Sequence, residues 1–144
     1  MSARPLLLAL VLAACATSAA SDVVPAALRG CWIERRGEDT VTMRWFPESG
    51  LAWRGDQLFY APGQEPERQG YRIEATAGEN EQFGWALCPQ AEPTNPPCRA
   101  LFFKDGGDVD YRFEIRASAE HLRLTMFDEG QETVLFDGAR DGCD

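Results

Sequence analysis

Apolar and polar residues alternate along most of the chain after residue 39. In "VDYRFEIR", the apolar residues Val109, Tyr111, Phe113 and Ile115 share one face, and charged residues fill the positions between them. A period of two is typical of β-strands that bury one face, whereas a buried helix face repeats every three to four residues. The alternation therefore predicts an all-β domain.

Turn signals divide this pattern into short segments rich in aromatic and β-branched residues. Gly55 and Asp56 predict a tight hairpin or a bulge inside one segment, and "DGGD" at 105–108 predicts a turn. Antiparallel strands with one apolar face each must stack as a sandwich or close as a barrel, and we predict a meander of roughly 8 to 10 strands closed into a small barrel. The clearest expected strands are Thr40–Phe46, Leu51–Tyr60, Tyr71–Thr76, Gln82–Cys88, Arg99–Lys104, Val109–Arg116, His121–Phe127 and Glu132–Gly138.

The first residues, "MSARPLLLALVLAACATSAAS", have the order of a secretory leader: Arg4, an apolar run too short to span a bilayer, then small residues. We interpret residues 1–14 as a cleaved signal peptide, 15–27 as a tether and 28–144 as one domain. Leu12–Cys15 resembles the lipobox of bacterial lipoproteins, and Ala16–Ala20 offers ordinary signal cleavage as the alternative.

The lipobox resemblance implies a function for Cys15. It would carry a lipid anchor such as palmitate and hold the protein at the bacterial cell envelope, on the periplasmic side of the outer membrane. Ordinary cleavage would instead give a soluble periplasmic or secreted protein.

The five cysteines fit this interpretation, because lipidation of Cys15 leaves an even number free to pair. Four cysteines allow three pairings. Spacing favours Cys88–Cys98, which bracket the proline-rich "PQAEPTNPP", and Cys31–Cys143, which would join the two ends of the domain. A zinc site is the competing interpretation, but the sequence contains no C-x-x-C and a single histidine.

The pairing of the chain ends has a geometric consequence. In a closed meander the first strand pairs with the last, which removes both sheet edges. If Cys31 lies opposite Cys143, Trp32 is diagonal to Arg140 on the other face of the sheet, where a cation–π contact is within reach.

Gly30, Trp32 and Arg140 together resemble the lipocalin and wider calycin group. In that group a G-x-W at the start of the first strand meets an arginine from the last strand of an eight-stranded barrel. The likeness covers about Leu28–Asp144 and implies a lipocalin-like barrel closed by these three residues. The C-terminal helix and middle-loop motif of typical lipocalins are not seen in this sequence, so the resemblance implies architecture rather than transport.

Charge and composition narrow the function classes. Loss of the leader, which contains Arg4 and no acidic residue, changes the formal net charge from −9 to −10. Such a domain is unsuited to nucleic acid, and a cationic protein is the expected kind of charged partner. Nucleotide-binding motifs are lacking, and the acidic Gly-rich turns do not match EF-hand spacing, so we expect no cofactor and no metal.

Catalytic residues are not predicted, because the only histidine, His121, is expected at a strand end among polar residues. Ser118 lies near it in sequence, and a weak enzyme that uses His121 is kept as an alternative.

The aromatic residues on the predicted strands either fill a solid core or line an apolar pocket. Our first hypothesis is a non-enzymatic envelope lipoprotein that binds an apolar small ligand. The alternative is a protein-binding module that resembles periplasmic inhibitors of cationic lysozymes. The candidate ligand-binding residues are Trp45, Trp53, Tyr71, Trp85, Tyr111 and Phe113.

Overall fold

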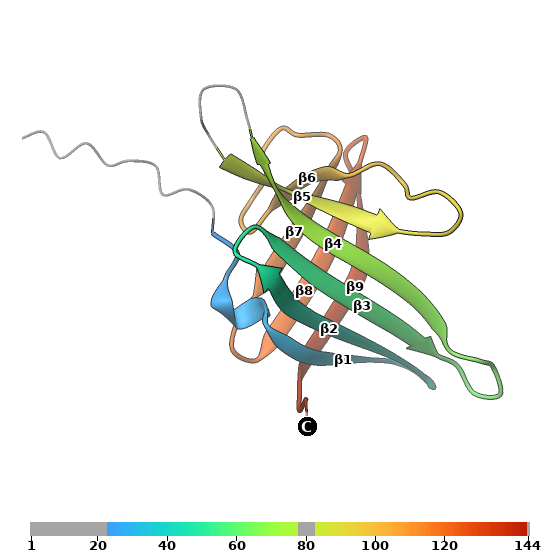
Figure 1. The fold of residues 1–144 in the computed structure, drawn as a ribbon. Coiled ribbons are helices and arrows are strands. Elements are labelled where there is room, and N and C mark those ends of the chain that lie inside the picture. The colour runs from blue at the N-terminus through green and yellow to red at the C-terminus, as the bar shows by residue number, and fades with distance from the viewer. Residues whose placement is uncertain (1–22, 78–82, 144) are drawn as a thin grey trace, which may run out of the picture.

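Nine strands close into a barrel in the computed structural model, which describes residues 23–77 and 83–143 (Figure 1). Each strand pairs with the next, and β1 pairs with β9, so the predicted all-β barrel is confirmed. A short 3₁₀ helix, η1 (Ala26–Leu28), precedes the first strand. The strands are β1 Gly30–Arg36, β2 Asp39–Ser49, β3 Ala52–Tyr60, β4 Glu67–Ala77, β5 Phe83–Gln90, β6 Arg99–Phe102, β7 Arg112–Ala117, β8 His121–Asp128 and β9 Gln131–Asp141.

One strand pair departs from the predicted antiparallel meander. β6 and β7 are parallel, with Leu101 opposite Phe113. A parallel pair needs a connection that returns to the starting end, and β6 has only four residues, so the nine residues 103–111 suffice. The predicted turn "DGGD" belongs to this crossover, and the strand expected from Val109 begins only at Arg112.

Two side chains of β7 hold the crossover in place. Glu114 Oε1 accepts hydrogen bonds from Arg112 Nε at 2.9 Å and from the main-chain N–H of Gly106 at 2.8 Å. Arg112 Nη1 donates to the carbonyl of Val109 at 2.7 Å. This buried, fully paired Arg–Glu couple replaces the alternation expected here, since Val109 and Tyr111 are exposed rather than turned inward.

β3 runs without interruption through Gly55, so the predicted hairpin or bulge at Gly55 and Asp56 is wrong. The glycine serves a packing role instead. A Cβ at this position would lie 2.6 Å from the Trp45 ring, so only glycine lets the indole lie flat on the strand. The irregularity lies in β2, where the register shifts between Pro47 and Ser49.

Inward-facing side chains from every strand except β3, together with Val24 and Leu28, form one buried core, and Trp53 and Phe59 of β3 pack against it partly buried. The core therefore begins N-terminal to Leu28, inside the segment expected to be a tether. Its largest fully buried side chains include Trp32, Trp45 and Phe136. The Trp45 and Tyr71 rings stack with centroids 6.1 Å apart.

A polar pair lies within this core. The Tyr71 hydroxyl donates to Gln57 Oε1 at 3.0 Å, and Gln57 Nε2 donates to the carbonyl of Leu135 at 3.1 Å. Burial raises the pKa of Tyr71 to about 12. Both polar side chains are thus satisfied, which fits their position inside the barrel.

The closing pair, β1 and β9, is confirmed, but its register differs from the prediction. Trp32 lies directly opposite Arg140, and Cys31 lies opposite Asp141 rather than Cys143. The Cys31–Cys143 disulfide is therefore diagonal and the Trp–Arg pair is direct, the reverse of the expected arrangement. Both predicted disulfides, this one and Cys88–Cys98, are present.

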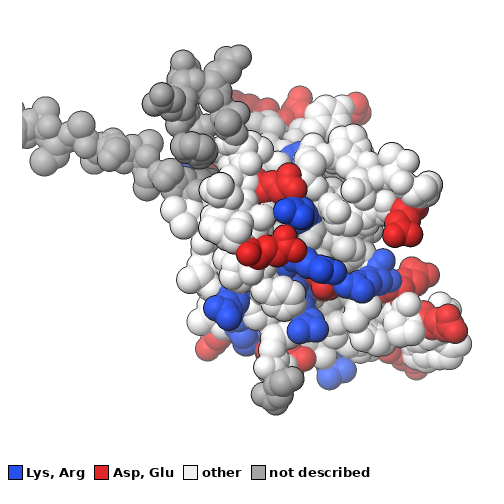
Figure 2. All heavy atoms as spheres, viewed as in Figure 1, with Lys and Arg blue, Asp and Glu red and all other residues white. Residues whose placement is uncertain are grey.

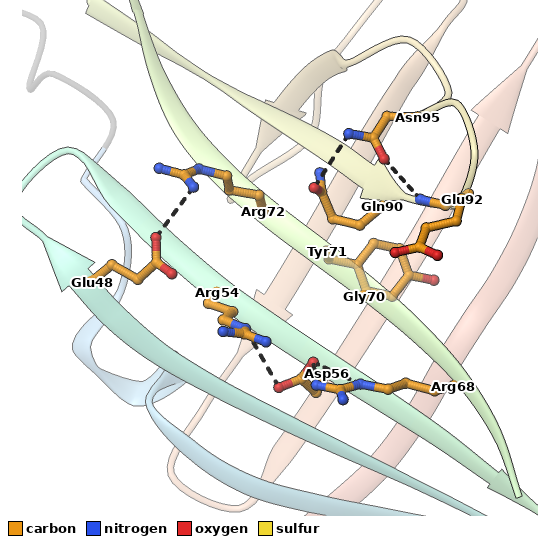
Figure 3. Close-up of a pocket in the computed structure, with 11 residues that line it drawn as sticks. Glu48, Arg54, Asp56, Arg68, Gly70, Tyr71, Arg72, Gln90, Glu92 and Asn95 are labelled. Carbon is orange, nitrogen blue, oxygen red and sulfur yellow. Dashed lines mark hydrogen bonds and ion pairs between the residues drawn. The ribbon is translucent and has the colours of Figure 1, made fainter.

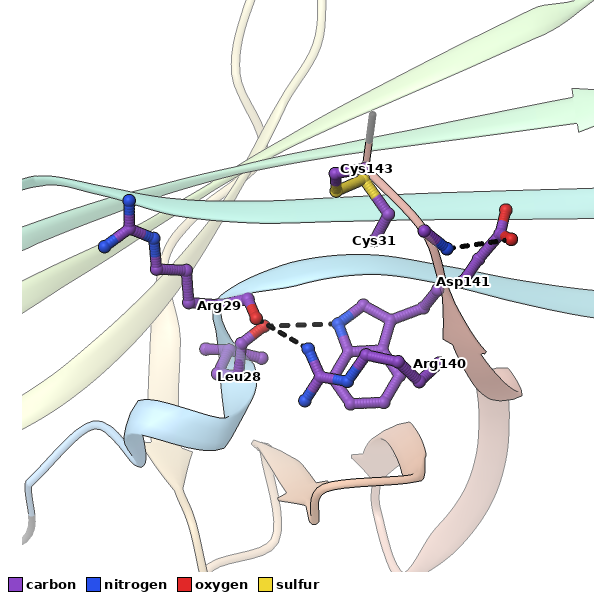
Figure 4. The surroundings of a disulfide bond; sticks show 8 residues. Leu28, Arg29, Cys31, Arg140, Asp141 and Cys143 are labelled. Carbon is purple, nitrogen blue, oxygen red and sulfur yellow. Dashed lines mark hydrogen bonds between the residues drawn. A yellow bond between two sulfur atoms is a disulfide. The ribbon is translucent and has the colours of Figure 1, made fainter.

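Arg140 closes this end of the barrel (Figure 4). Its guanidinium lies 3.9 Å from the Trp32 ring centroid and donates to the carbonyls of Arg29 and Ala27 at 2.7 and 2.6 Å. Further bonds reach the carbonyls of Ala119 and Ser118. Gly30 has φ +129°, and a Cβ there would lie 2.6 Å from Arg140 Nη1, so the G-x-W glycine makes room for the arginine.

Side chains continue the closure where the β1–β9 ladder stops. Only Cys31–Ile33 pair with β9. Beyond them Glu34 Oε2 accepts from the main-chain N–H of Asp137 at 3.0 Å, and Arg36 Nη2 donates to the carbonyl of Leu135 at 2.9 Å. Arg36 also donates to Glu34, which raises the pKa of Arg36. These bonds satisfy main-chain groups that a longer ladder would have paired.

Candidate functional site

The six aromatic residues predicted to line a pocket do not share one environment. Trp45, Tyr71 and Phe113 are buried in the core, and Trp53 and Trp85 pack partly buried against it. Tyr111 is 47% exposed, and its hydroxyl donates to Glu129 at 2.7 Å, which raises its pKa. The arrangement gives five of them a packing role and puts the sixth on the surface.

A groove of about 600 Å³ lies on the outer face of the sheet formed by β2 to β5. We call it the arginine groove, because Arg54, Arg68 and Arg72 project along it (Figure 3). These side chains point outward because their strand neighbours Gly55, Tyr71 and Ile73 point into the core. The other lining residues are Glu48, Asp56, Gly70, Tyr71, Gln90, Ala91, Glu92 and Asn95.

Gly70 forms the floor of the arginine groove. It pairs with Asp56 on β3 and with Gln90 on β5, so it lies in the middle of the outer face. Arg68 and Arg72 flank it on the same face of β4. Gly70 has no side chain, and the Gln90 side chain packs beside it, since a Cβ at Gly70 would lie 3.2 Å from Gln90 Cβ.

The loop 91–98 forms one wall, and several bonds hold it. The Cys88–Cys98 disulfide closes its base. Asn95 Oδ1 accepts from the main-chain N–H of Ala91 at 2.9 Å, and Gln90 Nε2 donates to the carbonyl of Cys88 at 3.0 Å. A disulfide and side-chain hydrogen bonds therefore hold the wall in place.

The arginines are paired but remain accessible. Arg68 Nη2 lies 2.5 Å from Asp56 Oδ1, whereas Arg54 Nε lies 3.8 Å from Asp56 Oδ2. Arg72 contacts Glu74 at 2.7 Å and Glu48 at 3.5 Å. The three arginine side chains are 45–57% exposed, so their ion pairs contribute little to stability.

The outer face of β1 to β4 has the opposite sign of charge from the whole chain. Its outward strand positions carry five arginines (35, 44, 54, 68 and 72) and three carboxylates (48, 56 and 74), a formal charge of +2. The whole chain has a formal net charge of −9. Figure 2 shows these basic and acidic side chains as a band across the face, and the local excess of guanidinium groups was hidden by the overall composition.

His121 and Ser118 come close but do not form a nucleophile–base pair. Ser118 Oγ accepts from the main-chain N–H of His121 at 3.1 Å and donates to its carbonyl at 3.3 Å. The imidazole Nε2 instead lies 2.5 Å from Asp137 Oδ1. Because the hydroxyl hydrogen-bonds to main chain, this arrangement lacks the contact that activates a serine.

Neither a metal-ligand cluster nor a membrane-spanning helix is found among the described residues. Across 23–77 and 83–143, no cluster of three or more histidine, cysteine or acidic side chains has an arrangement that could hold a metal ion. In the same part of the chain, no helix has the length and hydropathy needed to cross a bilayer. Cys15 and the leader lie outside the described residues.

Comparison with known proteins gives no relative: no family model, no curated protein and no solved structure matches this chain. The site must therefore be interpreted from its own geometry.

Sequence reasoning did not find the arginine groove, although part of its signal was present. Arg44, Arg54 and Arg72 occupy polar positions of alternating segments, whereas Arg68 falls in the loop expected before Tyr71. The gathering of the four arginines on one face depends on the register of two hairpins, β2–β3 and β3–β4, which the residues alone left open. The arrangement offers guanidinium donors and amide groups around an empty floor, and this is suited to binding a polar partner rather than to covalent chemistry.

Proposed function

We propose that this protein is a non-catalytic, protein-binding module of the bacterial cell envelope, and that it holds its partner at the arginine groove. The observation that supports this most is the groove itself, an open and polar surface with a fixed wall. Arginine is enriched at protein interfaces because its planar guanidinium makes several directed hydrogen bonds.

The mixed charge of the groove favours a protein as the partner. Three arginines alternate with Glu48, Asp56 and Glu92, and the amides of Gln90 and Asn95 lie among them. A polypeptide offers donors, acceptors and charges of both signs at comparable spacing. An apolar small molecule would leave these polar groups without partners, at a cost in binding free energy.

The two disulfides support an oxidising compartment such as the periplasm. The lipid anchor at Cys15 belongs to this proposal, as does attachment to the outer membrane. The lipocalin-like ancestry also belongs here, and the contact of Gly30, Trp32 and Arg140 supports it.

Binding of an apolar ligand inside the barrel is the second candidate. One observation favours it: the indole Nε1 of Trp45 is buried and has no hydrogen-bond partner among the described residues. A ligand with one acceptor group next to an apolar body would satisfy that donor.

The two candidates predict different results for protein purified from its own envelope fraction. Native mass spectrometry should show a retained lipid-sized mass if the barrel carries a ligand, and the protein mass alone if the outer groove is the site. Quantitative cross-linking in the same extract then compares Ala91→Trp, which blocks the groove, with Ala119→Trp, an exposed alanine outside it.

The groove proposal requires Ala91→Trp to lose the partner that the parent protein and Ala119→Trp retain. Hen-type cationic lysozyme is included as a defined partner at low and high salt, because a charge-dominated complex weakens as salt rises. Equal capture by both variants would remove the groove from the function.

A further inference from the structure

We propose that the arginine groove recognises an acidic segment of its partner, with one carboxylate seated above Gly70 between Arg54, Arg68 and Arg72. This inference rests on the proposed function and specifies the chemistry of the partner. It differs from the cationic partner that the net charge predicts, because the outer strand face around the groove carries more arginines than carboxylates, while the lining itself has three of each.

Arg54 and Arg68 both have guanidinium N–H groups that make no hydrogen bond within the described residues. Arg54 makes no hydrogen bond within the described residues, and its single ion pair, to Asp56, is 3.8 Å long. Arg68 directs Nε and Nη2 to the same Asp56 oxygen, and its Nη1 makes no hydrogen bond to any residue that the structure describes. Both side chains are more than half exposed, which leaves these N–H groups facing solvent beside Gly70.

The shape of the groove supplies the second step. Gly70 lies between Arg68 and Arg72 on β4, opposite Asp56 on β3 and Gln90 on β5, so two arginines, a carboxylate and an amide side chain border the space above it. A carboxylate there would accept from two guanidinium groups at once. Charge-assisted hydrogen bonds of this kind are about twice as strong as neutral ones.

The surrounding charge adds the third step. Arg44 on β2 lies opposite Asp56, and its guanidinium lies 5.1 Å from the Phe46 ring centroid. Among residues 23–77 and 83–143, no carboxylate forms an ion pair with it. Arg44 adds positive potential beside the groove without occupying it. An approaching carboxylate is therefore attracted over a distance comparable with the Debye length of about 8 Å.

The acidic residues of the groove decide between a peptide and a dense polyanion. Glu48, Asp56 and Glu92 are spread along the lining, so a chain of phosphates would place like charges against them. A peptide with a single glutamate among neutral residues avoids this repulsion. Its main-chain groups can also bond the Gln90 and Asn95 amides in the wall.

The test uses the mature full-length chain and three synthetic peptides with acetylated N-termini and amidated C-termini: Gly-Ser-Glu-Gly-Ser, the same peptide with Gln, and the same peptide with Lys. Titration is followed by NMR on the arginine Nε–Hε signals. We expect the Glu peptide to bind at least about tenfold more tightly than the Gln peptide, because the charge-assisted bonds are lost with the carboxylate. The signals of Arg54 and Arg68 should shift first.

A pair of arginine variants makes the assignment specific. Arg54→Gln should lower the affinity for the Glu peptide about tenfold. Arg116→Gln is the matched control, since Arg116 on β7 is 49% exposed with one ion pair of 3.6 Å, close to the 54% and 3.8 Å of Arg54. It should change the affinity less than about twofold, because its guanidinium is far from the groove in the strand order.

Three results would overturn the inference. These are equal affinity for the Glu and Gln peptides, tighter binding of the Lys peptide, or inorganic phosphate displacing the Glu peptide at a lower concentration than free acetate does. Failure here is separable from failure of the proposed function. If Ala91→Trp still abolishes capture of the partner while the Glu peptide does not bind, the groove is the interface but its partner is not acidic.

Discussion

Two arginines on this barrel have opposite surroundings. Arg140, at the closed end, donates to four main-chain carbonyls and stacks on Trp32. Arg54, on the outer face, has one ion pair of 3.8 Å and is 54% exposed. A guanidinium that directs four of its five N–H donors to the main chain stabilises the fold, whereas one with unused donors on the surface is available to a partner. The difference separates the structural end of the molecule from the proposed binding face.

The disulfides show the same division and provide the largest expected effect. Cys31 and Cys143 are separated by 112 residues, and Cys88 and Cys98 by 10. In the chain-entropy model the long loop contributes about 5 kcal/mol to the free energy of unfolding and the short loop about 3 kcal/mol. We expect the double variant Cys31→Ser/Cys143→Ser to be the less stable of the two double variants.

Urea unfolding of both double variants measures this difference. Peptide binding provides the complementary readout. The Cys88→Ser/Cys98→Ser variant has a looser groove wall, and binding of the Glu peptide should be weaker because the wall must then become ordered on binding. A long-loop variant as stable as the parent would mean that the β1–β9 ladder closes the barrel without covalent help.

Replacing each arginine by glutamine should lower the free energy of unfolding by amounts that differ by about 3 kcal/mol. Arg140→Gln removes hydrogen bonds to four exposed or part-buried main-chain carbonyls and the contact with the Trp32 ring, which together should cost about 3 kcal/mol because water replaces part of the lost bonding. Arg54→Gln removes one weak exposed pair and should change stability by less than about 0.5 kcal/mol. Thermal and urea unfolding of the two single variants check both values. Comparable losses would contradict the proposed division.

Tyr71 lies behind the groove floor, and its titration tests how firmly the barrel wall is packed there. Burial raises its pKa from the ordinary 10.0 to about 12. The folded state keeps its proton between these values while the unfolded state loses it, so the folded state binds more protons and stability falls as pH rises. The contribution is complete below pH 10 and is lost through about pH 12, a change of about 2 to 3 kcal/mol.

Urea unfolding of the parent protein and of Tyr71→Phe between about pH 9 and pH 12 isolates this contribution, because only the parent has the buried phenol. The variant should be about 1 kcal/mol less stable at neutral pH, where it lacks the hydrogen bond to Gln57, and should lose less stability on alkalinisation. Parallel curves would mean that water reaches the phenol in the folded protein.

Particular residues show how much the sequence could predict. Alternation identified the strands. Cys31, Cys143, Trp32 and Arg140 identified the closing pair, because a disulfide and a Trp–Arg contact both require the two ends of the domain to lie close together. The exact register failed by two positions, since both registers place the cysteines within bonding distance. The parallel β6–β7 pair was missed because "DGGD" fits a hairpin turn between antiparallel strands as well as it fits a crossover connection. The buried pair of Arg112 and Glu114 distinguishes the crossover, and it is seen only in the structure.

Asp56→Asn should have a small effect on stability and bears most directly on the proposed site. Asp56 is 18% exposed and forms ion pairs with both Arg54 and Arg68, so it occupies the position that competes with a partner's carboxylate. Its neutralisation should cost less than about 1 kcal/mol of stability, because the pairs are exposed. The same change should raise the affinity for the Glu peptide about threefold to tenfold, since two guanidinium groups lose their intramolecular anion. Glu74→Gln, which changes a carboxylate at the edge of the face, should raise it less. If Asp56→Asn lowers the affinity instead, the carboxylate of Asp56 positions the two arginines for the partner. The affinity lost when the arginines become less ordered would then exceed the affinity gained from removing a negative charge.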